Sequence, residues 1–330
     1  MKTTTLGPSG IRCSAIGLGT WAMGGWMWGG GDNAGATLAI QASLDAGVTL
    51  IDTAPAYGLG RSERLVGTAL KGRRHEAVIA TKCGLVWHTQ KGTHFFEEDG
   101  HPVYRYLGRD AIAYEVEQSL ANLQTDYIDL YQSHDDDANT PLEDTLGAFD
   151  DLVKAGKVRA IGASNFTAPR LAEALDVSER LGIARYESLQ PLYNLYDRAV
   201  FEDELEPLCL KREVGVINFY ALAAGFLTGK YRTEADAAKS ARGASTTKKY
   251  LNPRGLRILE ALDKVAQQYN AKPGQVAIAW QIARPSVTAP IASATSIAQL
   301  DELVTATQLK LDAGTIAMLD RASEEEGKAA

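Results

Sequence analysis

The chain has 330 residues, of which 45% are hydrophobic and 23% charged, and its formal net charge is −7. These values are typical of a globular protein, and the negative charge argues against a general nucleic-acid binder, because affinity for phosphate requires a basic face. No apolar run approaches the roughly 18 residues that span a bilayer, the first residues lack the apolar stretch of a secretory signal, and the three cysteines are too scattered to predict a disulfide framework or a zinc motif. We therefore expect a cytoplasmic protein without a membrane or nucleic-acid partner.

The predicted elements alternate between strand and helix from one end of the chain to the other. A short hairpin comes first, with arms at residues 3–6 and 11–14 around a Gly-Pro-Ser-Gly turn. Runs of β-branched and aromatic residues then predict eight strands, at residues 15–18, 48–52, 77–81, 127–132, 158–162, 186–190, 214–219 and 287–291. Amphipathic stretches predict helices at residues 34–46, 109–122, 142–155, 170–181, 198–211 and 273–283.

This alternation continues without a linker or a change of composition. It predicts one domain over residues 1–330, with an α/β fold in which a (β/α)8 TIM barrel follows the N-terminal β-hairpin. A doubly wound sheet is the competing architecture, and the number of strands does not exclude it.

Three longer segments, residues 24–33, 85–108 and 231–251, fit no strand–helix unit. Loops of this length are usually functional lids or binding loops, and otherwise disordered. The first two follow the first and third predicted strands and would overhang the catalytic rim of a barrel. Their aromatic residues either hold the loops together or contact a substrate. The tryptophans that we expect nearest to the substrate are Trp21, Trp26, Trp28 and Trp87.

Four polar residues stand at or just after predicted strands: Asp52, Tyr57, Lys82 and His134. Parallel strands would bring all four to one rim. Reduction of a carbonyl needs a hydride donor and a proton donor, and a tyrosine can give the proton although its ordinary pKa is about 10. We expect the charge of Lys82 to lower the pKa of Tyr57, with Asp52 as counter-ion of Lys82. His134 would donate a hydrogen bond that orients the substrate oxygen. Each residue alone could be structural, but the combination favours catalysis.

These residues lie in longer motifs, and the resemblance that the motifs carry extends over essentially the whole chain. Residues 52–58, the Thr81-Lys82 pair, residues 126–134 and residues 156–166 resemble segments of the aldo-keto reductase superfamily, and residues 19–26 resemble its bacterial branch related to potassium-channel β subunits. The resemblance implies a (β/α)8 barrel, an extended nicotinamide cofactor and direct hydride transfer without a metal.

The resemblance also implies cofactor contacts, position by position. Ser164, Asn165 and Gln190 would hold the nicotinamide carboxamide, and Phe219 would stack on the ring. Lys230 and Arg242 would contact phosphate. The implied cofactor contacts are Thr20, Trp21, Asp52, Ser164, Asn165, Gln190, Phe219, Tyr220, Ala221, Leu222, Gly225, Lys230, Arg242, Thr295, Gln299 and Glu302, and the implied substrate contacts are Trp21, Tyr57, Trp87 and His134.

Two departures from the family pattern affect specificity. Ser296 and Leu303 stand where related bacterial enzymes have a basic residue and an asparagine, and a hydroxyl grips a 2′-phosphate far less well than a guanidinium. NADP(H) is still the expected cofactor in preference to NAD(H), because Lys230 and Arg242 remain. Residues 135–137, all aspartate, follow His134. They either make the mouth of the site acidic or belong to a solvated loop.

The function expected from these features is reduction of aldehydes or ketones to alcohols with an NAD(P)H hydride and Tyr57 as general acid. Oxidation of a sugar or alcohol in the reverse direction is the main alternative. Two further alternatives are a metal-dependent barrel lyase or isomerase built on His134 and the neighbouring aspartates, and a cofactor-sensing regulatory protein. The substrate, the preferred direction and the oligomeric state stay open.

Overall fold

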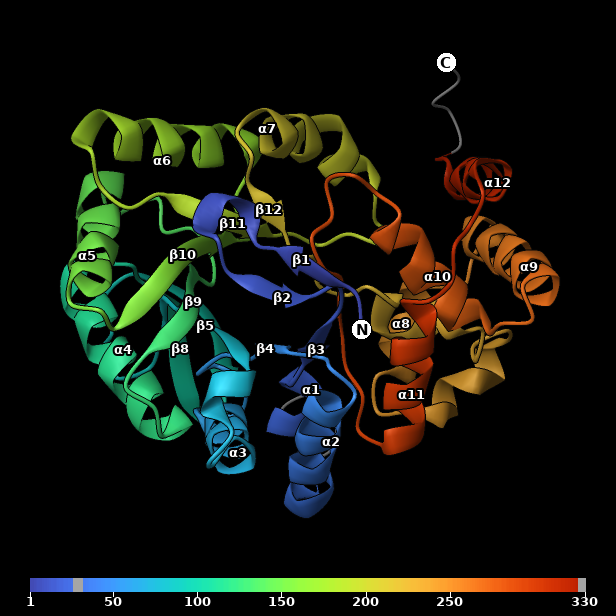
Figure 1. Ribbon diagram of the computed structural model, residues 1–330, viewed down its shortest axis with the longest axis horizontal. Coiled ribbons are helices and arrows are strands. Elements are labelled where there is room, and N and C mark those ends of the chain that lie inside the picture. Colours follow the sequence, from blue (N-terminus) through green and yellow to red (C-terminus); the bar gives the residue numbers. More distant parts are fainter. Residues whose placement is uncertain (26–31, 326–330) are drawn as a thin grey trace.

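The computed structural model describes residues 1–25 and 32–325, and its centre is a barrel of eight parallel strands surrounded by helices (Figure 1). In sheet order the strands are β12 (Gly215–Val216), β11 (Tyr186–Gln190), β10 (Val158–Ser164), β9 (Ile128–Ser133), β5 (Val78–Cys83), β4 (Leu50–Asp52), β3 (Gly17–Gly19) and β13 (Ile291–Ala292). A parallel bridge between Val216 and Val287 joins the two ends of this sheet. The chain thus forms a (β/α)8 barrel rather than the open doubly wound sheet.

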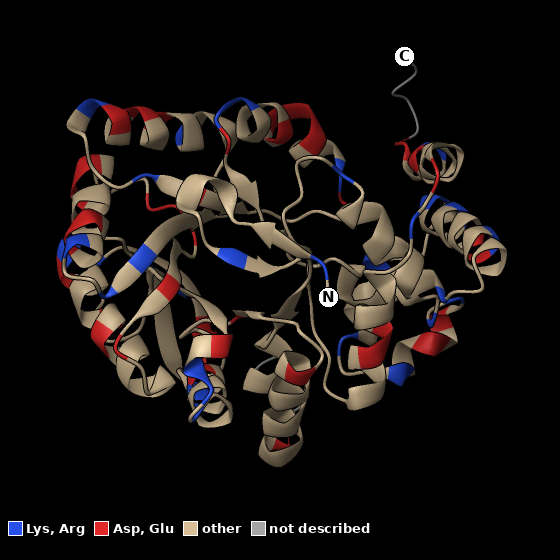
Figure 2. Cartoon of the chain, in the orientation of Figure 1, with Lys and Arg blue, Asp and Glu red and all other residues tan. Residues whose placement is uncertain are grey.

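The outer helices carry acidic and basic side chains side by side, for example along α6 and α9 (Figure 2). Figure 1 shows them as a ring around the strands. The helices are α1 (Trp21–Gly24), α2 (Asn33–Asp45), α3 (Arg61–Ala69), α4 (Arg109–Leu123), α5 (Leu142–Lys154), α6 (Ala168–Leu181), α7 (Glu206–Lys211), α8 (Gly243–Tyr250), α9 (Pro253–Gln268), α10 (Pro273–Ile282), α11 (Ile297–Ala306) and α12 (Ala313–Ser323). Among the described residues, no helix is both long and apolar enough to cross a membrane.

The predicted N-terminal hairpin is present and contributes to the core of the barrel. Its strands β1 (Thr3–Thr5) and β2 (Arg12–Ser14) pair antiparallel. Leu6, Ile11 and Cys13 are at most 3% exposed and pack in one cluster with side chains from several barrel strands, including Leu50 and Leu130. The hairpin therefore covers the end of the barrel that lies away from the carboxyl ends of the strands.

The period of two along each strand places the candidate catalytic residues inside the barrel. Leu50 and Ala80 belong to the interior cluster that also contains hairpin residues. Because side chains alternate between the faces of a strand, Asp52 and Lys82, two residues further on, point into the same interior. Both stand near the carboxyl ends of their strands, which is the catalytic face of this fold.

The segment of residues 85–108 is structured differently from the predicted loop. It forms a three-stranded antiparallel sheet of β6 (Leu85–Val86), β7 (Thr93–Glu98) and β8 (His101–Arg105), in the order β6-β8-β7. Asp99 and Gly100 both have positive φ and form the tight turn between β7 and β8. The segment of residues 231–251 is also structured, because it contains η5 (Glu234–Lys239) and α8. Most of the first segment, including Trp26 and Trp28, lies outside the described residues.

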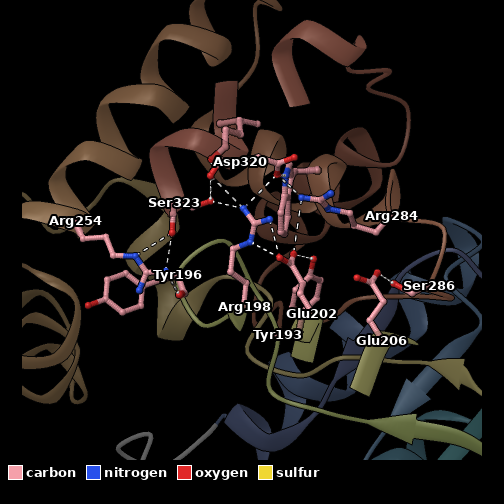
Figure 3. Close-up of polar contacts among 12 residues, drawn as sticks. Tyr193, Tyr196, Arg198, Glu202, Glu206, Arg254, Arg284, Ser286, Asp320 and Ser323 are labelled. Atoms are coloured by element: carbon pink, nitrogen blue, oxygen red, sulfur yellow. Dashed lines mark hydrogen bonds and ion pairs between the residues drawn. The ribbon is translucent and has the colours of Figure 1, made fainter. Parts of the chain in front are cut away.

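A network of charged side chains fixes the C-terminal helix α12 to the barrel (Figure 3). Asp320 of α12 accepts hydrogen bonds from the indole Nε1 of Trp280 at 2.9 Å and from Arg198 at 3.3 Å, and it pairs with Arg284. Arg198 also pairs with Glu202 of η3 (Phe201–Leu205) at 2.7 Å. The network thus joins helices that are far apart in the sequence.

Candidate active site

The four candidate catalytic residues meet at the carboxyl end of the barrel. The ammonium of Lys82 donates to both carboxylate oxygens of Asp52 at 2.9 Å and lies 3.1 Å from the hydroxyl of Tyr57. It also donates to the carbonyl of Thr53 at 2.9 Å. The rings of Tyr57 and His134 meet edge to face with their centroids 5.8 Å apart. The geometry therefore assembles an acid, a cation, its counter-ion and an imidazole.

Burial determines the protonation state of this group. The pKa of Tyr57 is raised because burial disfavours the phenolate, and this effect outweighs the lowering by Lys82. Lys82 thus acts in the predicted direction, but the net shift is upward. Burial and the nearby charge of Lys82 hold the pKa of His134 well below its usual range. At neutral pH the site therefore offers a protonated phenol and a neutral imidazole, both of which can donate a hydrogen bond.

The tetrad is held in place by neighbouring groups. Gln190 donates from Nε2 to Asp52 Oδ2 at 2.7 Å, and Trp21 stacks on the ring of Tyr57 with centroids 5.8 Å apart. The backbone carbonyl of His134 accepts from the amide of Asn165 at 2.9 Å. These contacts hold the carboxylate of Asp52, the ring of Tyr57 and the backbone of His134 in place.

A cavity of about 1070 Å³ opens above the tetrad. It is large enough for an extended dinucleotide together with a small substrate. Of the residues predicted to bind cofactor or substrate, the following line it: Trp21, Asp52, Tyr57, His134, Ser164, Asn165, Gln190, Phe219, Tyr220, Ala221, Leu222, Gly225, Lys230, Arg242, Thr295, Gln299 and Glu302.

At one end of this cavity the backbone turns beside a cationic side chain. Ala223, Ala224 and Gly225 follow one another with positive φ, and the N–H groups of Ala223 and Gly225 donate to the carbonyls of Tyr220 and Leu222. A Cβ on Gly225 would lie 3.1 Å from the ammonium of Lys230. The ammonium therefore lies directly beside this turn. The residues present thus fit the pyrophosphate of a nicotinamide cofactor.

Two of the predicted contact residues lie outside the cavity wall. Thr20 is 1% exposed, and its hydroxyl is shared between the carbonyl of Asp52 and the hydroxyl of Ser62, so its role here is to hold β4. Trp87 packs against the cluster of Ala56, Leu85 and Val103 instead of lining the cavity.

The three aspartates after His134 are paired. Asp135 accepts from Arg105 at 2.8 Å and Asp136 from Arg170 at 3.0 Å. Asp137 accepts from the backbone of Leu107 and the hydroxyl of Thr140. Arg105 and Arg170 therefore compensate the charges of Asp135 and Asp136, and all three carboxylates order the loop. Among the described residues, no group of three or more His, Cys, Asp or Glu side chains could hold a metal ion.

Several cavity residues were not predicted individually. Phe95 and Phe96 belong to the unexpected sheet, and Gly274 and Gln275 begin α10. The aromatic content of residues 85–108 was a signal for the first pair. The Pro-Gly-Gln sequence at the start of a predicted helix was the only signal for the second pair.

Comparisons with known proteins agree with this geometry. The sequence pattern of the Aldo/keto reductase family matches residues 15–324. The chain belongs to the aldo/keto reductase family. Among similar proteins of this family is the aldo-keto reductase YhdN of Bacillus subtilis, 38% identical over 92% of this chain and 88% of the relative. The NADH-specific methylglyoxal reductase of Escherichia coli is 34% identical over 94% of this chain and 95% of the relative.

Plant relatives are also similar. A probable voltage-gated potassium channel β subunit of Oryza sativa is 33% identical over 92% of this chain and 90% of the relative. The resemblance to both the bacterial enzymes and the channel subunits is thus confirmed. Membership of the aldo/keto reductase family makes the chain an oxidoreductase of a family that uses nicotinamide cofactors and small-molecule substrates.

Proposed function

We propose that this aldo/keto reductase reduces aldehydes or ketones to alcohols with Tyr57 as the general acid. The observation that carries the proposal is the hydroxyl of Tyr57 at the cavity floor, 3.1 Å from the Lys82 ammonium. A group that gives a proton to a developing alkoxide must face the substrate and be protonated at working pH. The raised pKa of Tyr57 meets the second condition.

The other site residues orient the carbonyl and stabilise the charge that proton transfer leaves on Tyr57. The nicotinamide cofactor, when bound, supplies the hydride. The neutral His134 donates a hydrogen bond to the carbonyl oxygen and so fixes its orientation beside Tyr57. Lys82 stabilises the tyrosinate left after proton transfer, and Asp52 keeps the buried ammonium charged. In the direction of oxidation, tyrosinate would act as the base.

NADPH is the first candidate donor, because two cationic side chains, Lys230 and Arg242, line the cavity, although Lys230 lies at the turn assigned to the pyrophosphate, which NADH also carries. One observation favours NADH. Where α11 begins, the cavity is lined by Thr295, Gln299 and Glu302, none of which is a cation that could bind a 2′-phosphate, and the hydroxyl of Ser296 caps the helix by accepting from the backbone N–H of Gln299 at 3.3 Å. The NADH-specific relative makes this the second candidate.

One set of measurements tests the reaction and the cofactor together. We expect Tyr57→Phe to lower kcat for carbonyl reduction by about a hundredfold or more, since a general acid contributes roughly that much. Titration of tryptophan fluorescence should show that NADPH binds the variant as tightly as the wild type, and more tightly than NADH does. The matched control is Tyr114→Phe, at an exposed tyrosine on α4. Undiminished turnover in Tyr57→Phe would contradict the acid role, and tighter binding of NADH would select the second cofactor.

A further inference from the structure

The antiparallel sheet of residues 85–105 presents two phenylalanines to the cavity. Phe95 and Phe96 line it together with Tyr57 and His134. The pairing of β7 with β8 is irregular between His94 and Phe96, and an extra residue of this kind redirects neighbouring side chains. The ring centroids of Phe95 and Phe96 are 5.2 Å apart. We call this pair the phenylalanine wall.

The same sheet is fixed to both sides of the catalytic centre. At one end of β8, Arg105 donates to Asp135, the residue after His134, and its guanidinium lies 3.5 Å from the ring centroid of Phe95. At the end of β7, the carboxylate Oε1 of Glu98 accepts from the backbone N–H of Gly58 at 3.1 Å. Gly58 is the residue after Tyr57. The two anchor contacts, Arg105 to Asp135 and Glu98 to Gly58, thus each reach the residue directly after a proposed donor, His134 or Tyr57.

Glu98 is an unusual residue for this position. It is 1% exposed, and among the described residues its second oxygen, Oε2, is buried without a hydrogen-bond partner. A buried carboxyl without full pairing is costly, and an apolar side chain would fill the space at a lower cost. Its charged or titratable neighbours are Asp99 in the turn and His101, which is opposite Glu98 in the strand pair. Burial raises the pKa of Glu98 to about 7.

We infer that Glu98 is a positioning residue that holds the phenylalanine wall over Tyr57, and that this wall selects carbonyl substrates with an aryl or branched apolar group. The inference rests on the proposed function. Tyr57 has supports of its own in Lys82 and Trp21, and the Gly58 N–H also reaches the carbonyl of Ala56 at 3.1 Å. Release of Glu98 therefore displaces the wall while the acid stays in place. Loss of Glu98 should therefore change KM for bulky substrates rather than kcat.

The test compares Glu98→Ala, Glu98→Gln and Glu97→Ala in the full chain, with benzaldehyde and methylglyoxal as probe substrates. Glu97 is the matched control, because its exposed side chain is on the same strand and pairs with His94 at the surface. We expect Glu98→Ala to raise KM for benzaldehyde about tenfold, with kcat within about twofold, because a buried hydrogen bond is lost. Methylglyoxal should be nearly unaffected. Glu98→Gln, which keeps the acceptor for Gly58, should behave as wild type at about pH 6, where the Glu98 carboxyl is protonated.

A pH series distinguishes a role of the titrating Glu98 carboxyl from a role of this side chain in packing alone. Between about pH 6 and about pH 8.5 the wild-type carboxyl becomes charged, and its unpaired oxygen then favours water. We expect KM for benzaldehyde to rise about threefold over this range in the wild type and to stay constant in Glu98→Gln. A parallel rise in both proteins would overturn the role of Glu98.

Amide hydrogen exchange provides a measurement that does not depend on turnover. Faster exchange along β7 and β8 in Glu98→Ala than in Glu97→Ala supports the anchor, and equal exchange overturns it. Wild-type KM values in Glu98→Ala, or the same loss in Glu98→Gln, also overturn it. If no form of the protein oxidises NADPH or NADH with any carbonyl, the proposed function and the substrate half of this inference fail, whereas the exchange result still decides the anchor.

Discussion

At the scale of single residues, the protonation state of Tyr57 depends on a balance between burial and the charge of Lys82. Burial raises the pKa of Tyr57 and the charge of Lys82 lowers it, and burial has the larger effect. Reduction requires the protonated phenol, so its rate is constant below this pKa and falls above it. The same balance would limit oxidation, which requires the phenolate, to alkaline pH.

This balance gives a prediction for the pH dependence of kcat at saturating substrate. In the wild type we expect kcat for reduction to stay level to beyond about pH 9, because the pKa of Tyr57 lies above its ordinary value. In the double variant Asp52→Asn/Lys82→Met, which removes both charges of the buried pair, kcat should fall. The pH above which kcat declines should also rise, because burial then raises the pKa of Tyr57 without the opposing charge of Lys82. Steady-state rates across a pH series measure both effects, and an unchanged profile would count against the tuning role of Lys82.

The convergence of the four proposed catalytic residues could be predicted from the sequence, whereas their environment could not. Asp52, Tyr57, Lys82 and His134 have chemically specific side chains in motifs at strand ends, and the structure brings them together. The anchor at Glu98 and the pairing of the three aspartates depend on contacts across 30 or more positions of the chain. No local pattern contains such information.

At the scale of elements, several predicted helices agree closely with the structure. The predicted helices at residues 34–46, 109–122 and 142–155 agree with α2, α4 and α5 to within one residue at each end. The sheet of β6, β7 and β8 was missed because its strands carry exposed polar and aromatic residues, so no apolar alternation indicates them. Its Asp-Gly turn was the available signal.

The network around α12 gives a prediction at the same scale. Asp320→Ala removes the acceptor of Trp280 Nε1 and leaves Arg198 and Arg284 with one carboxylate partner fewer. We expect a loss of about 1–3 kcal/mol in the free energy of unfolding, because the buried Trp280 Nε1 donor and two partly exposed cations lose a partner. Urea denaturation followed by circular dichroism measures it. Glu260→Ala, at an exposed position on α9, is the control. Equal stability of the two variants would contradict a stabilising role for the network.

At the scale of the whole molecule, the outer surface mixes charges of both signs (Figure 2), while several carboxyl groups are buried within. Glu63 and Glu115 are at most 5% exposed and lie behind β5. Glu63 accepts from the hydroxyl of Thr81 and Glu115 from the backbone N–H of Gly84. The two residues thus support the strand that carries Lys82.

These buried carboxyls predict that the protein becomes less stable as the pH rises. Burial raises the pKa of Glu115 from 4.5 to about 8 and that of Glu98 to about 7, and it also raises the pKa of Glu63. Through these carboxyls the folded state binds more protons than the unfolded state between about pH 4.5 and pH 8, which lowers stability as the pH rises. His134, whose pKa is lowered, acts in the opposite direction below about pH 6.5, so the decrease belongs chiefly to the range above that pH. Each group contributes at most a few kcal/mol. Thermal unfolding should give a lower Tm at about pH 9 than at about pH 5.5. Glu115→Gln, which keeps an acceptor for Gly84, should flatten this dependence, whereas Glu117→Gln, at an exposed position on the same helix, should not. Parallel pH profiles of the two variants would mean that Glu115 is already charged in the folded protein.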